Sequence, residues 1–189
     1  MIRNHRTEVL SDHWYTLRKH TFELRLRSGE WATQTREAYD RGNGAGILLY
    51  NKAEGKVLLT RQFRLPTFVN GNPDGMMIEV CAGLLDEADP ADCIRRETEE
   101  ETGYRIQEVK KVLEAYMSPG AVTEILYLFV GEYHAHQKVS EGGGLEEETE
   151  DIEVLECTLD EALAMVKNGT IRDAKTIMLL QYAKLEGLV

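Results

Sequence analysis

Three glutamates within residues 95–102 have a spacing that suits the binding of a divalent cation. If this segment is helical, Glu97, Glu100 and Glu101 occupy positions i, i+3 and i+4 and lie on one face of the helix. Converging carboxylate oxygens without a His or Cys ligand favour Mg²⁺ or Mn²⁺ over zinc. The cluster therefore predicts a magnesium or manganese site, with an ordinary solvated helix surface as the alternative.

The same spacing has an energetic cost that a bound cation would offset. Like charges at i, i+4 destabilise a helix by roughly 0.2–0.5 kcal/mol per pair. Acids near a helix C-terminus also oppose the helix dipole, which prefers cations there by about 0.3–1 kcal/mol per charge. At helical spacing Arg96 can pair with Glu100, and Arg95 with Glu99, which leaves part of the repulsion uncompensated.

Caps and hydrophobic periodicity predict the elements that position this cluster. Asp89 as N-cap, Pro90 in the first turn and Gly103 as C-terminal stop predict a helix between them. Residues 76–82 predict a strand that ends at Gly83, and residues 67–75 predict a loop. The cluster should therefore lie on a helix that follows directly after a strand.

The rest of the chain predicts a mixed α/β sandwich. Short apolar strands are expected at residues 45–50, 57–62, 109–115, 125–132 and 152–157. A capping box of Thr158 and Glu161 starts a second helix, and a third is expected at residues 173–185. Residues 14–38 alternate with a period near two, and predict a small antiparallel β unit before the sandwich. Strands interleaved with helices favour the sandwich.

Composition excludes several classes of protein. The 189 residues include 22 Lys and Arg against 33 Asp and Glu, a net charge of −11, so no nucleic-acid partner is expected. No apolar segment approaches the ~18 residues of a membrane helix, and residues 1–9 lack a signal-peptide pattern, so no membrane partner is expected either. Three cysteines, an odd number without metal-ligand spacing, predict free thiols and a cytoplasmic protein.

The glutamates and the residues around them resemble the Nudix box, the strand-loop-helix signature of the Nudix hydrolases. The matching positions are Gly83, Arg96, Glu97, Glu100, Glu101, Gly103 and Tyr104. Asp89 stands where the family has Glu, and one residue fewer separates it from the Arg. The resemblance implies the Nudix α/β/α sandwich with a mixed sheet over residues 42–189. Residues 1–41 would form the N-terminal β unit.

Further motifs are similar to the bacterial branch of this superfamily that hydrolyses GDP-mannose. They are RGNGA at 41–45, RQFR at 61–64, CAGLL at 81–85, MSPG at 117–120, GGG at 142–144 and IRDAKT at 171–176. The resemblance implies a Mg²⁺-dependent pyrophosphatase, with Mn²⁺ as a possible replacement, that yields GMP and mannose 1-phosphate. It also implies a homodimer whose N-terminal β units are exchanged between subunits.

The resemblance assigns the metal site to four acids and one backbone carbonyl. Glu97, Glu100, Glu101 and the carbonyl of Ala82 match metal-ligand positions, and Glu97 and Glu101 count as catalytic. Glu150 matches a further metal-site glutamate, and the strand expected at residues 152–157 anchors its side of an acidic loop. We therefore expect Glu150 to be a ligand and the general base, with Glu147 or Glu148 as alternatives.

The resemblance also implies a set of substrate contacts. For some of these residues a purely structural role remains an alternative. The matching positions are Trp14, Arg36, Glu37, Arg64, Ala82, Gly83, Leu84, Glu124 and Lys175. Trp14, Arg36 and Glu37 would reach the nucleotide from the partner subunit. Arg64 and Lys175 would meet phosphates, and the alternative for each is a snorkelling surface cation. Glu124 would accept hydrogen bonds from sugar hydroxyls, and Trp14 could equally serve a core or an interface.

Three functions compete at this point. Pro119, 16 residues beyond Gly103, occurs in the superfamily with ADP-ribose-type substrates, so an ADP-ribose pyrophosphatase is the nearest alternative. A non-catalytic module that senses a nucleotide sugar would be expected to lack one or more of the helix glutamates, and all of them are present. An acidic protein-interaction domain gives no reason for Glu97 and Glu101 to share a face.

Overall fold

The computed structural model describes residues 1–85, 89–145, 147 and 149–189. The chain divides into two compact units. The first contains Met1–Asn43 and Tyr116–Ile125, and the second contains Gly44–Ala115 and Leu126–Val189. A mixed sheet with helices and a separate antiparallel sheet at the N-terminus confirm the predicted fold class.

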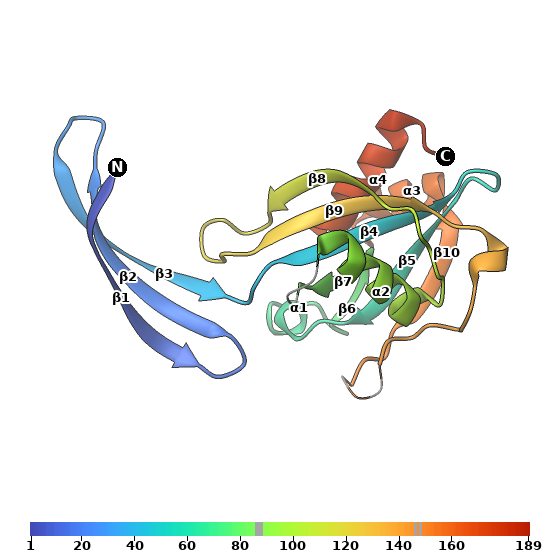
Figure 1. The fold of residues 1–189 in the computed structure, drawn as a ribbon, viewed down its shortest axis with the longest axis horizontal. Coiled ribbons are helices and arrows are strands. Elements are labelled where there is room, and N and C mark those ends of the chain that lie inside the picture. Colours follow the sequence, from blue (N-terminus) through green and yellow to red (C-terminus); the bar gives the residue numbers. More distant parts are fainter. Residues whose placement is uncertain (86–88, 146, 148) are drawn as a thin grey trace. The chain divides into compact units, whose positions relative to one another are not determined.

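The first unit is a three-stranded antiparallel sheet in the order β1-β2-β3, drawn in blue in Figure 1. Its strands are β1 (Ile2–Asp12), β2 (Thr16–Arg25) and β3 (Trp31–Asp40). The sequence interpretation missed β1, because every residue of this strand is exposed and it carries no alternation of apolar and polar residues. The segment Tyr116–Ile125 joins this unit through backbone hydrogen bonds between Tyr39 and its neighbours Ala121 and Thr123.

The second unit is built on a seven-stranded mixed sheet. Its main path runs β10-β5-β4-β9-β8, while β6 pairs with β5 and β7 pairs with β4. Strand β4 is parallel to β9 and antiparallel to β5 and β7. The strands are β4 (Gly44–Asn51), β5 (Lys56–Phe63), β6 (Met76–Glu79), β7 (Cys81–Leu84), β8 (Lys110–Tyr116), β9 (Ile125–Glu132) and β10 (Glu153–Thr158).

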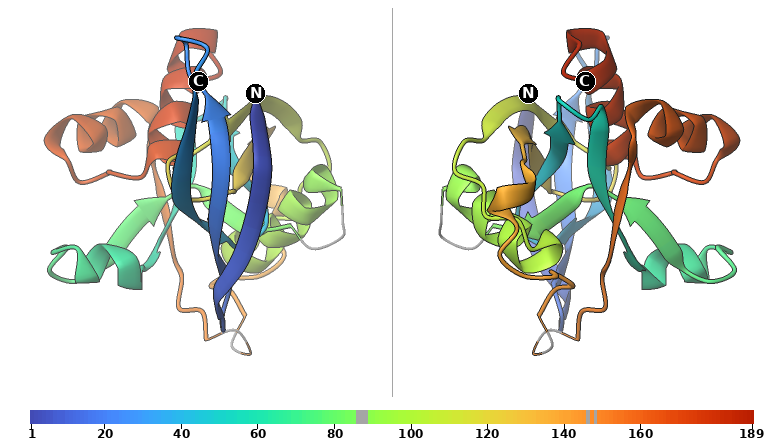
Figure 2. Two further views of the ribbon diagram at one scale, coloured as in Figure 1. Left: turned by 90° about the vertical axis from the view of Figure 1, so that its left-hand side faces the viewer. Right: turned by 90° about the vertical axis from the view of Figure 1, so that its right-hand side faces the viewer.

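Helices cover both faces of this sheet. Helix α2 (Pro90–Thr102) packs on β7 and β4, and α3 (Leu159–Asn168) and α4 (Ala174–Glu186) lie on the opposite side, as Figures 1 and 2 show. A short helix α1 (Leu65–Val69) and a 3-10 turn (Ala135–Gln137) complete the elements. Helix α1 lies where the sequence predicted the start of a loop, because five residues are too few for helical periodicity. No helix among the described residues is long and apolar enough to cross a membrane.

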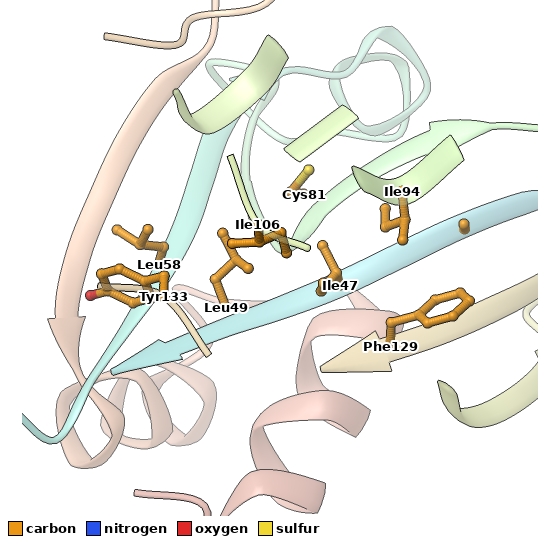
Figure 3. Close-up of a cluster of buried hydrophobic side chains, with 9 residues drawn as sticks. Ile47, Leu49, Leu58, Cys81, Ile94, Ile106, Phe129 and Tyr133 are labelled. Atoms are coloured by element: carbon orange, nitrogen blue, oxygen red, sulfur yellow. The ribbon is translucent and has the colours of Figure 1, made fainter. Parts of the chain in front are cut away.

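A buried cluster of apolar side chains fixes α2 on the sheet (Figure 3). Ile47 and Leu49 of β4 are two residues apart and therefore point to the same face of the sheet, where they meet Ile94 of α2 and Ile106. All four are at most 3% exposed. Burial of each contributes roughly 1.5–3 kcal/mol. This packing sets the position of the helix that carries the glutamates.

Candidate active site

The helix that carries the acidic cluster begins and ends where the sequence predicts. The side chain of Asp89 accepts a hydrogen bond from the amide of Ala91 at 2.8 Å, and Pro90 occupies the first turn. Gly103 ends the helix with a φ of 77°, a left-handed conformation that favours glycine. A Cβ at this position would lie 2.1 Å from the carbonyl oxygen of Ser140, so the close approach of that segment also requires glycine.

Glu101 is the most deeply placed of the three glutamates. It is 2% exposed, and its Oε2 accepts a hydrogen bond from the amide of Ala82 at 3.3 Å. Burial raises the pKa of Glu101 to about 8; a hydrogen bond with Cys81 opposes the rise, and the charge of Glu97 adds to it. A bound cation would neutralise this buried carboxylate and so stabilise its ionised form.

Glu97 lies against the backbone of β7. A Cβ added at Gly83 would lie 2.1 Å from Cδ of Glu97, so only glycine leaves room for the carboxylate. Burial raises the pKa of Glu97, Arg96 opposes this shift, and the charge of Glu100 adds to it. Strand and helix thus bring the backbone around Ala82 and the predicted helix ligands into one region.

The expected ion pairs on α2 are partly wrong. Arg96 lies 4.0 Å from Glu100, as predicted. Arg95 instead contacts Asp92 at 2.6 Å, one helical turn earlier, and donates to the carbonyl of Gln107 at 2.8 Å. Glu99 pairs with an arginine beyond the helix end. Residues outside the helix compete for these side chains, which helical spacing alone does not reveal.

Glu150 is near enough to act on two of the helix acids. Its charge contributes to the raised pKa of both Glu97 and Glu101. Its own position is fixed locally, because its Oε2 accepts a hydrogen bond from the amide of Leu145 at 3.1 Å. Of the two alternatives in the same loop, Glu147 is exposed and Glu148 lies outside the described residues.

The chemistry of these acids fits a hard divalent cation. Among the described residues, no group of three or more His, Cys, Asp or Glu side chains is already arranged to hold a metal ion. Two half-buried or buried carboxylates with raised pKa values, and a third acid within electrostatic range, are nevertheless a donor set that Mg²⁺ or Mn²⁺ prefers. A cation would offset the repulsion that burial makes costly.

Arg64 and Lys175, the two predicted phosphate contacts, meet at one carboxylate. Arg64 follows β5 and binds Glu79 through two hydrogen bonds of 2.8 and 3.2 Å. Lys175, in the first turn of α4, binds the same carboxylate and lies 3.1 Å from Asp173. The sequence interpretation passed over Glu79. An acid among the apolar residues of a short strand was the signal that could have found it.

The remaining predicted contacts of the second unit lie on β7. Ala82, Gly83 and Leu84 are each half-buried. The carbonyl of Leu84 accepts a hydrogen bond from the thiol of Cys93 at 3.3 Å, which ties the end of the strand to α2.

The other four predicted contacts belong to the first unit. Trp14 is 82% exposed and contacts Tyr15 edge-on, so it is not a core residue of the chain. Arg36 and Glu37 are neighbours on β3, and both are exposed. Glu124 is half-buried and lies 3.5 Å from Arg41.

Comparison with known proteins identifies both parts of the chain. A family model described as "NUDIX domain" matches residues 40–180, and one described as "GDP-mannose pyrophosphatase NudK N-terminal domain" matches residues 1–39. A curated relative from Yersinia enterocolitica, named "GDP-mannose pyrophosphatase", is 58% identical over 188 residues, which are 100% of this chain and 97% of the relative. Relatives of the same name come from Yersinia pestis (55% identical; 97% and 92% of the two chains) and Pectobacterium atrosepticum (56%; 95% and 92%).

Proposed function

The chain belongs to the Nudix family of hydrolases, and on that premise we propose that it cleaves the diphosphate of GDP-mannose to GMP and mannose 1-phosphate. One structural observation carries this proposal. Glu97 and Glu101 of α2 lie against Gly83 and Ala82 of β7, and the charge of Glu150, from a loop distant in the sequence, contributes to the raised pKa of both. The substrate is the one named in the relatives that match the full length of the chain.

Each residue of the proposed site has a part in hydrolysis. Glu97, Glu100, Glu101, Glu150 and the carbonyl of Ala82 would hold Mg²⁺, for which Mn²⁺ can substitute. When bound, the cation neutralises phosphate charge and helps to orient water. A water oxygen attacks one phosphorus as the bridging P–O bond breaks, and a carboxylate accepts the water proton. We assign that general-base role to Glu150, because it lies on a loop rather than within the helix cluster.

The predicted substrate contacts divide between phosphate and sugar-nucleotide recognition. Arg64 and Lys175 supply positive charge for the phosphates, and Gly83 and Leu84 offer backbone at the strand end. Glu124 would accept hydrogen bonds from sugar hydroxyls. Trp14, with its exposed ring in the turn between β1 and β2, would stack on the base from the partner subunit, and Arg36 and Glu37 of β3 would contact the nucleotide from the same unit.

We propose that the protein is a homodimer that pairs through its N-terminal sheet. The support is the apolar side chains that this sheet leaves exposed in a single chain, which are Ile2, Val9, Leu10, Trp14 and Trp31. Burial of these side chains against a second copy of the sheet would stabilise the dimer. We place the enzyme in the cytoplasm, on the support of its three free cysteines.

A substrate panel tests the proposed function. Purified protein with Mg²⁺ is incubated with GDP-mannose, ADP-ribose and other nucleotide sugars under identical conditions, and the products are separated chromatographically. We expect the highest kcat/KM with GDP-mannose and release of GMP. Preference for ADP-ribose would favour the alternative that Pro119 suggested. Binding of GDP-mannose without any turnover would identify a sensing module instead.

A further inference from the structure

Glu79, at the end of β6, is a buried acid that holds two cations at once. It is 4% exposed. Its Oε1 accepts from Nε of Arg64 at 2.8 Å and its Oε2 from Nη2 at 3.2 Å, which is the two-pronged geometry that fixes a guanidinium in orientation as well as position. The same Oε2 accepts from Nζ of Lys175. One carboxylate therefore joins the residue after β5 to the first turn of α4.

Both cations are also fixed by their backbone surroundings. The amide of Arg64 donates to the carbonyl of Gly75 at 2.8 Å, which closes the segment between β5 and β6. Lys175 follows Asp173, the N-cap of α4. One residue further along, the hydroxyl of Thr176 accepts a hydrogen bond from the amide of Val80 at 2.8 Å. The end of β6 and the first turn of α4 are thus held together by a second contact next to the carboxylate.

The charge of Glu79 is stable in this environment. Burial by itself raises the pKa of Glu79, but Lys175 and Arg64 outweigh burial and lower it to about 2. The carboxylate is therefore ionised at neutral pH. Only two of the five N–H donors of the guanidinium are used by Glu79. The side chain of Arg64 remains 39% exposed, which leaves part of it open to a ligand.

We propose that Glu79 is a positioning residue, which holds Arg64 and Lys175 in place for the phosphates of the substrate. The inference rests on the proposed function for the identity of the substrate. Its physical content is preorganisation: long cationic side chains lose rotamer freedom when they bind a phosphate, and a buried carboxylate that already orders them removes that cost. In the opposite role, Glu79 would be a counter-ion that weakens phosphate binding by neutralising the cations. Removal of its charge would then strengthen substrate binding instead of weakening it.

A double-mutant cycle of Glu79→Gln and Arg64→Ala tests the proposal. Glutamine keeps the shape of the side chain but loses the charge. We expect Glu79→Gln to lower kcat/KM for GDP-mannose by roughly ten- to a hundredfold, the usual loss when a supporting residue of a site is removed. Since Glu79 acts through Arg64 and Lys175, the double variant should lose less than the product of the two single losses, because only the part of its effect that acts through Lys175 remains without Arg64.

Two further variants separate positioning from a general loss of structure. Thr60→Val removes a buried hydroxyl that donates to the backbone carbonyl of Glu79, and it leaves the carboxylate and both cations untouched. It should destabilise the fold without changing kcat/KM. Glu79→Asp keeps the charge but withdraws the carboxylate by one methylene. It should fold as the wild type does and still lose part of kcat/KM, which keeps the test decisive if Glu79→Gln does not fold.

The outcomes distinguish this inference from the proposed function. Three outcomes would each overturn the positioning role while hydrolysis by the wild type still stands. The first is a double variant whose loss equals the product of the two single losses. The others are an unchanged kcat/KM in both Glu79→Gln and Glu79→Asp, and a lowered KM in Glu79→Gln. If the wild type hydrolyses no substrate of the panel, the proposed function fails. The same cycle is then measured on the Kd of inorganic pyrophosphate with Mg²⁺, by calorimetry, with the same expected pattern.

Discussion

Glu97 and Gly83 are in such close contact that a Cβ at residue 83 would lie 2.1 Å from Cδ of Glu97. The first belongs to α2 and the second to β7, so this contact sets how near a helix carboxylate comes to the strand backbone. A glycine at the end of the strand is therefore a spatial requirement of the acidic site as well as a turn signal.

Substitution of Gly83 by Ala should impair the site while the fold remains intact. The new methyl group would meet the flexible end of Glu97, which can move aside, and Gly83 does not have the left-handed φ that would add backbone strain. A displacement of about 1 Å in a catalytic group can cost on the order of a hundredfold in rate. We expect a loss of that size in kcat/KM, with a nearly unchanged Tm.

Gly46→Ala is the matched control for this variant. Gly46 pairs with Ala82 on the neighbouring strand, and a Cβ there would make only ordinary contacts, at 3.4 Å and beyond. Its kcat/KM should stay close to that of the wild type. Equal losses of kcat/KM in the two variants would show that altered strand packing, rather than a displaced Glu97, causes the loss.

Glu101→Gln should abolish turnover of GDP-mannose. The change removes a proposed metal ligand without changing the size of a fully buried side chain, so we expect a larger loss than the roughly hundredfold typical of residues that support a metal ligand. GMP release measures the effect, and circular dichroism checks the fold. Glu99→Gln, on the same helix but paired with Arg105, should keep its activity. Undiminished turnover in Glu101→Gln would reject the assignment of the metal site.

Binding of Mg²⁺ with nucleotide should release a proton near neutral pH. Burial raises the pKa of Glu101 to about 8 in the ion-free protein, so most of this carboxyl is protonated at pH 7, whereas a metal ligand must be ionised. Calorimetry in buffers of different ionisation enthalpy counts the protons. Release should be close to one at pH 7 and should vanish above pH 9. No proton release at pH 7 would contradict the buried, protonated state of Glu101.

The stabilising effect of Glu79 should disappear in acid. Its pKa in the folded chain is about 2, whereas an unfolded glutamate titrates near 4.3, so its contribution is complete above that value and is lost as the pH falls towards 2. The free energy of unfolding of wild type and Glu79→Gln should therefore differ most above pH 5 and converge at lower pH. Urea unfolding at a series of pH values measures this difference. A constant gap down to pH 2 would be inconsistent with an ionised Glu79.

Deletion of residues 1–40 should abolish the proposed dimer. This change removes β1, β2 and β3, with the apolar side chains that the sheet exposes. Sedimentation of the full chain and of residues 41–189 compares the two masses. The milder Val9→Lys, on exposed β1, should weaken dimerisation without a truncation. A full-length chain that sediments as an active monomer would exclude the dimer proposal.

The sequence by itself determined the features that depend on near neighbours. The i, i+3, i+4 spacing of the helix glutamates, the cap at Asp89 and the stop at Gly103 follow from the geometry of one helix, and the structure places the helix there. The capping box of Thr158 and Glu161 is confirmed for the same reason. Caps and helical spacing depend on only a few consecutive residues, so the sequence is sufficient to predict them.

The tertiary structure alone decided which distant charges meet. Glu79 captures Arg64 and Lys175 because β5, β6 and α4 converge on it, and no spacing in the sequence reveals that convergence. Strand β1 likewise escaped prediction, since a strand exposed on all sides has no hydrophobic pattern. Ion pairs between separate elements depend on strand register and helix packing, which the whole core fixes at once.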